Sequence, residues 1–83
     1  MFRVVLSRSA RKSLDAIPTA IADRIVQRLR SLELNPRPSD VKKLRGREGW
    51  RVRVGDYRII YSIHDEELLI LVVTLGHRRE VYR

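Results

Sequence analysis

Apolar positions follow two different periods along this chain, and the change of period divides it into helices and strands. Residues 2–6 form a short, mostly apolar run, which predicts a strand. Apolar residues then recur at spacings of four and three, at Ala10, Leu14 and Ile17. This spacing predicts one face of a short helix, with Ser7 or Ser9 as its N-cap.

A second and clearer helix follows the first after Pro18. The next helix is expected to begin around Thr19, because proline ends the first one. Its apolar face is formed by residues at steps of four, four and three: Ile21, Ile25, Leu29 and Leu32. The segment Asn35-Pro36-Arg37-Pro38 ends this helix. The connection between the helices is short, so the two should form an antiparallel hairpin.

The second half of the chain has the period-2 pattern of strands. After a basic loop at residues 35–47, apolar and basic residues alternate over 50–54. Gly55-Asp56 is a two-residue turn of the kind that closes tight hairpins, and the alternation resumes over 57–63. Residues 64–67 form the next turn, and 68–75 are apolar except for Thr74, as in a buried strand.

These elements predict a single domain over residues 1–83 of the α+β class, with the order β-α-α-β-β-β. Three consecutive strands should form a meander, with the first strand joining its edge. The expected architecture is an antiparallel sheet with the helix hairpin packed on one face. The apolar run at 68–75 is too short to cross a bilayer, so no membrane span is expected, and no signal peptide is recognised.

Charge adds a prediction about the partner. The chain has 18 Lys and Arg against 10 Asp and Glu, a net charge of +8, and no Cys. Without Cys there is no disulfide framework or thiolate zinc site, which fits a reducing cytoplasm. Arginine dominates the basic residues, and guanidinium groups suit phosphate contacts. The excess predicts a polyanion, with nucleic acid the leading candidate, although a basic chain can also serve solubility or meet an acidic partner.

The hairpin around Gly55-Asp56 gathers three of these arginines. If the turn has two residues, Val54 faces Tyr57 and Arg53 faces Arg58 across the strands. Period-2 alternation then places Arg51, Arg53 and Arg58 together on one face of the sheet, with no acidic residue between them. Like charges opposite each other are unfavourable, so the cluster favours an anion site over three arginines extended into water.

Two further groups of candidate residues flank this cluster. His77, Arg78 and Tyr82 follow the apolar strand, where Tyr offers a surface for stacking a base and His can transfer protons. The basic loop contributes four further positive charges, at Lys42, Lys43, Arg45 and Arg47. No spacing of His, Asp or Glu fits a metal site, so neither a metal nor another cofactor is expected.

Three motifs resemble a known family. They are Lys-Leu-Arg-Gly at residues 43–46, Tyr-Arg-Ile-Ile-Tyr at 57–61 and Gly-His-Arg-Arg-Glu-Val-Tyr at 76–82. Together with the helix hairpin they resemble the RelE/ParE superfamily of type II toxins over nearly the whole chain, and the last motif points to the RelE branch. The resemblance implies a ribosome-dependent endonuclease that cleaves mRNA in the A site of the 70S ribosome, without metal, by attack of the RNA 2′-hydroxyl.

The same resemblance implies site residues and partners. The basic residues of the loop at 42–47 would bind RNA phosphates of the ribosome without reading sequence. Arg51 and Arg53 lie where the family has two catalytic basic residues, Arg58 and Arg78 match its transition-state arginines, and Tyr82 matches its terminal tyrosine. An acidic, RelB-like antitoxin should wrap the toxin in a hetero-oligomer. The best-known RelE enzymes have lysines at the positions of Arg51 and Arg53. Because arginine keeps its proton, Tyr82 and His77 remain the candidates for the general base.

Two alternatives stay open at this point. A ParE-type toxin that inhibits DNA gyrase shares the fold without needing the arginine and tyrosine site. A relative that binds nucleic acid without cleaving it would also fit, since arginine replaces both lysines.

Overall fold

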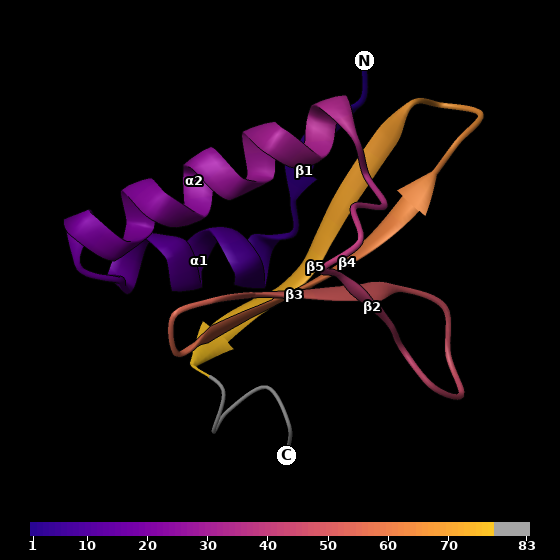
Figure 1. Ribbon diagram of the computed structural model, residues 1–83. Helices are drawn as coiled ribbons and strands as arrows, with labels where there is room; N and C mark the ends of the chain where they lie inside the picture. The colour runs from indigo at the N-terminus through magenta and orange to yellow at the C-terminus, as the bar shows by residue number, and fades with distance from the viewer. Residues whose placement is uncertain (78–83) are drawn as a thin grey trace.

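The chain folds as two helices on a five-stranded sheet, as the computed structural model shows for residues 1–77 (Figure 1). Strand β1 leads into the two helices, and four strands follow them. The elements are β1 (Arg3–Leu6), α1 (Arg8–Ala16), α2 (Thr19–Leu34), β2 (Lys42–Lys43), β3 (Trp50–Val54), β4 (Tyr57–His64) and β5 (Leu69–His77). The α+β class and the predicted order of helices and long strands are therefore confirmed.

The sheet is mixed rather than antiparallel, which corrects one detail of the prediction. The strand order is β1-β5-β4-β3-β2, and β1 pairs with β5 in the parallel direction. The backbone N–H of Phe2 donates to the carbonyl of Glu33 at 2.9 Å, so α2 ends beside the start of β1. After α2 the chain has thus returned to the end of the sheet where β1 starts. Strands β3 and β5 run parallel to β1, and β4 between them runs in the opposite direction.

The two-residue strand β2 lies within the segment predicted as a loop. It pairs antiparallel with β3, with Lys42 opposite Arg51 and Lys43 opposite Trp50. Beyond β2, the N–H of Leu44 donates to the carbonyl of Gly49 at 3.0 Å. This short strand attaches the basic loop to the sheet.

Both helices cover the same face of the sheet (Figure 1). The side chains of Ile25, Leu32, Ile59 and Tyr61 have no exposed surface between the layers. The hydroxyl of Tyr61 donates to the carbonyl of Pro36 at 2.8 Å. Within residues 1–77 the core contains no charged side chain, and no helix there is long and apolar enough to cross a membrane.

A bulge in β5 changes which face its last residues occupy. Ile60 pairs with Thr74 and Tyr61 pairs with Val72, so Val73 is an extra residue without a partner on β4. The Ser7 side chain, which caps α1 by accepting from the N–H of Ala10, also donates to the carbonyl of Val73 at 2.8 Å. The bulge is therefore tied to the start of α1.

Candidate nucleic-acid interface

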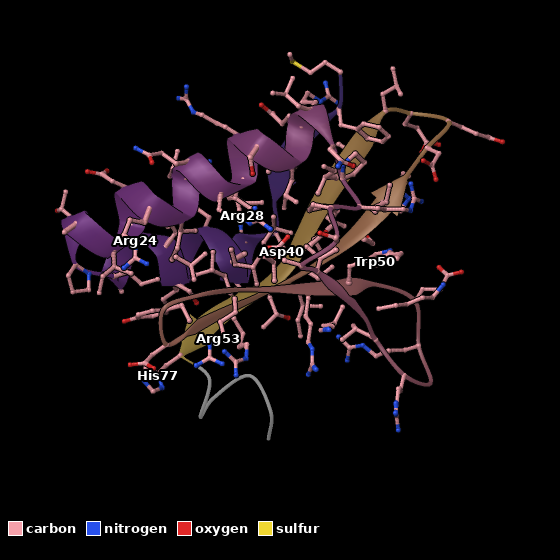
Figure 2. The ribbon with its side chains drawn as sticks, in the orientation of Figure 1. Arg24, Arg28, Asp40, Trp50, Arg53 and His77 are labelled. Atoms are coloured by element: carbon pink, nitrogen blue, oxygen red, sulfur yellow. The ribbon has the colours of Figure 1, made fainter. Side chains whose placement is uncertain are left out.

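Three arginines share the sheet face that the helices leave uncovered. Arg53 lies directly opposite Arg58, and Arg51 lies opposite Ile60, as the two-residue turn predicted. Alternation places Val52 and the other core residues of β3 on the helix side. In Figure 2, Arg53 projects from β3 away from the helices. The predicted shared face is confirmed.

Lys42 joins these arginines because β2 pairs with β3. Residues directly opposite in an antiparallel pair point to the same face, so Lys42 lies beside Arg51. Together they surround a shallow pocket of about 320 Å³. Its lining residues are Asp40, Lys42, Arg51, Val52, Arg53 and Arg58. Four of these six side chains carry a positive charge, which suits an anion.

The sequence prediction missed Asp40, an acid that lines this pocket. Its carboxylate accepts two hydrogen bonds from Nη2 of Arg28 on α2, at 2.6 and 2.7 Å. The hydrogen bond from this guanidinium holds the pKa of Asp40 below its usual value, so the carboxylate stays ionised at neutral pH. Figure 2 shows Arg28 and Asp40 close together between α2 and β3. Because Arg28 compensates the charge of Asp40, the pocket keeps its positive excess.

The arginines of the pocket differ in their surroundings. Arg53 is exposed, and its Nε donates to the carbonyl of Gly55 at 3.1 Å. Gly55 has a φ of 58°, which the tight turn requires and which glycine adopts without strain. Arg58 is half-buried, and its Nη1 is shielded from solvent. The turn and the sheet therefore hold these side chains at one end of the hairpin.

His77 is not part of this cluster, contrary to our expectation. It pairs with Tyr57 at the end of β5, and the two rings meet edge to face at 5.7 Å between centroids and 77° between planes. Both line a pocket of about 220 Å³ with residues of α1, on the helix side of the sheet. His77 and Arg53 lie at the same end of the molecule (Figure 2). The strand pairing, and the α1 residues that share a pocket with His77, place the two on opposite faces of the sheet. Arg78 and Tyr82 lie outside the described residues.

Three of the four basic residues predicted to bind RNA, Lys42, Lys43 and Arg45, line a further pocket of about 450 Å³ together with Arg51. Lys42 also lines the arginine pocket, whereas Lys43 has its Nζ 5.7 Å from the ring centroid of Trp50. Arg45 and Arg47 are exposed in the loop between β2 and β3. Only Lys42 therefore contributes to the arginine pocket.

The arrangement can bind a phosphate through several charges at once. Guanidinium groups present paired N–H donors that match phosphate oxygens. Over residues 1–77, no group of three His, Cys, Asp or Glu side chains could hold a metal ion. The chemistry available in the pocket is electrostatic stabilisation of an anion, with Lys42 as its one ammonium group.

Comparison with known proteins identifies the family of this chain. Residues 4–82 match the family described as the ParE toxin of the type II toxin–antitoxin system parDE. The archaeal RelE–RelB complex from Pyrococcus horikoshii contains a chain that is 33% identical, with a TM-score of 0.84 and coverage of 95% of this chain and 97% of that one.

A solved structure and a curated relative from Mycobacterium tuberculosis agree with that match. The toxin–antitoxin complex RelBE2 contains a chain that is 30% identical, with a TM-score of 0.74, covering 93% of this chain and 98% of that chain. Toxin RelG is 29% identical over 85 residues, covering 99% of this chain and 97% of the relative. This chain therefore belongs to the RelE/ParE superfamily of type II toxins, in its RelE branch.

Proposed function

We propose that this toxin is a ribosome-dependent endoribonuclease that cleaves mRNA in the A site of the 70S ribosome. The observation that carries the proposal is the pocket formed by Lys42, Arg51, Arg53 and Arg58 on the open face of the sheet. The 2′-hydroxyl of the RNA attacks the adjacent phosphorus, and the bond from phosphorus to the 5′-oxygen breaks. The products are a 2′,3′-cyclic phosphate and a 5′-hydroxyl end.

In this reaction the arginines stabilise charge. Negative charge grows on the phosphate oxygens as the 2′-oxygen attacks, and donors already aimed at that position lower the barrier. Removal of one such donor typically slows a reaction by about 100- to 1000-fold. Arg58 is the strongest candidate among the described residues, because its half-buried guanidinium is less screened by water than that of Arg53.

The test is cleavage by the purified toxin on 70S ribosomes that carry a short mRNA with a vacant A site. The expected result is one cut within the A-site codon and none in free RNA, with a loss of about 100- to 1000-fold for Arg58→Ala. Arg8→Ala, the same substitution at the exposed start of α1, is the control for the loss of one positive charge. An intact mRNA with the wild-type toxin would overturn the proposal.

The name of the matched family favours a second candidate, a ParE-type toxin that inhibits DNA gyrase. That activity predicts gyrase-linked DNA breaks after the toxin is induced, with mRNA left intact. Mapping of mRNA ends and of DNA breaks in the same culture distinguishes the two. A-site cuts without DNA breaks support the endoribonuclease.

The proposal includes an acidic, RelB-like antitoxin as the partner in a hetero-oligomer. Two of the related structures are complexes of a RelE-type toxin with its antitoxin. The net charge of +8 would favour an acidic partner. We expect the neighbouring reading frame to encode a small acidic protein, and its co-expression with the toxin should restore growth and yield a stable complex. Failure of that protein to bind would argue against it as the antitoxin.

A further inference from the structure

The cations of the pocket differ in whether they can give up a proton. Guanidinium groups keep theirs under all ordinary conditions, so Arg51, Arg53 and Arg58 can bind charge but cannot transfer a proton. Asp40 is held ionised by Arg28 and has no proton to donate at neutral pH. Among the described residues that line the pocket, Lys42 alone carries a transferable proton.

The backbone fixes which lysine enters the pocket. The pairing of Lys42 with Arg51 directs its side chain to the arginine face, and the next residue, Lys43, points to the other face against Trp50. Directly opposite residues have Cβ atoms about 4.5–5.5 Å apart, so the Lys42 ammonium is within reach of an anion that binds to Arg51 in the pocket. A shift of the register by one residue would exchange the two lysines.

From this placement we propose that Lys42 is the general acid of the cleavage reaction, an inference that rests on the proposed function. As the bond from phosphorus to the 5′-oxygen breaks, the Lys42 ammonium donates a proton to that oxygen, which leaves as a 5′-hydroxyl. The 2′-hydroxyl loses its own proton to solvent or to a base, and the neutral Lys42 amine is reprotonated from water. Proton transfer of this kind contributes about 100- to 10,000-fold to a rate.

The test compares Lys42→Arg with the wild type on two RNA substrates bound to the ribosome. Lys42→Arg keeps the positive charge and removes the transferable proton. One substrate has the normal 5′-oxygen at the cleavage site, and the other has sulfur in its place. A thiolate leaves without being protonated, so the sulfur substrate does not need a general acid.

On the normal substrate, Lys42→Arg should be slower than the wild type by at least about 100-fold. On the sulfur substrate, the two proteins should cleave at the same rate within a few-fold. Lys12→Arg, the same exchange on the exposed surface of α1, is the matched control and should cleave both substrates at the wild-type rate. Arg58→Ala should stay slow on both, because the charge on the phosphate still needs stabilisation.

Each other outcome overturns the inference. If Lys42→Arg cleaves the normal substrate at the wild-type rate, Lys42 does not transfer the proton, and the proposed function stands without it. If Lys42→Arg is slow on both substrates, Lys42 acts through position or contact rather than as an acid. If the wild type cleaves neither substrate, the proposed function itself fails. Thermal unfolding and ribosome binding of Lys42→Arg show whether its fold and affinity are intact.

Discussion

Reversal of the charge at Arg53 should make the protein more stable and less active at once. Arg53 faces Arg58 directly across the hairpin, so two positive charges oppose each other on neighbouring strands. Arg53→Glu replaces this repulsion with attraction. Cross-strand charge pairs contribute about 0.2–1 kcal/mol, so the change from repulsion to attraction amounts to about 1 kcal/mol.

Part of this gain is offset by a lost hydrogen bond. The Nε of Arg53 donates to the carbonyl of Gly55 at 3.1 Å, and such a bond contributes about 0.5 kcal/mol at an exposed site. The net rise in the free energy of unfolding is then about 0.5 kcal/mol, or about 2–4 °C in the midpoint of thermal unfolding. In 1 M salt the Debye length falls to about 3 Å, and the difference should largely disappear.

Activity should change in the opposite direction. A carboxylate in the pocket repels the phosphate that the other cations attract, so cleavage on the ribosome should fall by at least about 100-fold. Arg8→Glu lowers the net charge equally and lies outside the pocket, so it should retain cleavage. Circular dichroism during heating and end mapping of the cleaved mRNA measure the two effects. A destabilised Arg53→Glu, or one that cleaves at the wild-type rate, would refute this reasoning.

Three further predictions concern the fold. Tyr61→Phe removes the hydrogen bond to Pro36 and should lower the free energy of unfolding by about 1 kcal/mol at pH 7, measured with urea. Burial raises the pKa of Tyr61 to about 12, so as the pH rises the unfolded chain loses the phenol proton before the folded chain does. The free energy of unfolding of the wild type should therefore fall by up to about 3 kcal/mol between about pH 10 and 12, and that of Tyr61→Phe should not show this fall. The pKa of Asp40 is lowered by Arg28, so its stabilisation is present above pH 4 and lost below it, and the urea midpoint of Asp40→Asn should fall less steeply in acid than that of the wild type. Gly55→Ala forces a side chain to a φ of 58° and should cost about 1–2 kcal/mol in thermal unfolding.

The parts of the site that the sequence could predict are those set by local geometry. A two-residue turn at Gly55-Asp56 leaves one register for the hairpin, and this register places Arg53 opposite Arg58. The apolar faces of both helices follow from their period for the same reason. These predictions need only residues that are close together in the sequence.

The parts that could not be predicted depend on distant segments. Strand β2 has two residues, too few to show a period, and it forms only because β3 lies beside it. Asp40 and Arg28 are twelve residues apart, and the ion pair depends on how the loop returns over α2. Lys42 and Asp40 therefore enter the pocket through tertiary pairing that no local pattern records.

A single extra residue in β5 separates His77 from the arginine face. Ile70 and Val72 point to the core, and uninterrupted alternation from them would place His77 on the arginine face. The bulge at Val73 inserts one residue into β5 and reverses the alternation beyond it. His77 therefore lies against Tyr57 on the helix side, and nothing in the apolar run 68–75 marks where the bulge occurs.

The separation of the two sheet faces explains how the fold tolerates its own repulsion. The helix side buries the core, and over residues 1–77 this core contains no charged group. Arg53 on the arginine face is exposed to water, which screens its charge, so opposing Arg53 and Arg58 costs only about 1 kcal/mol or less. An anion that enters the pocket removes this cost, and its binding is strengthened by the same amount. Relief of the repulsion between Arg53 and Arg58 therefore adds to the free energy of anion binding. A neutral pocket of the same shape would lack this contribution.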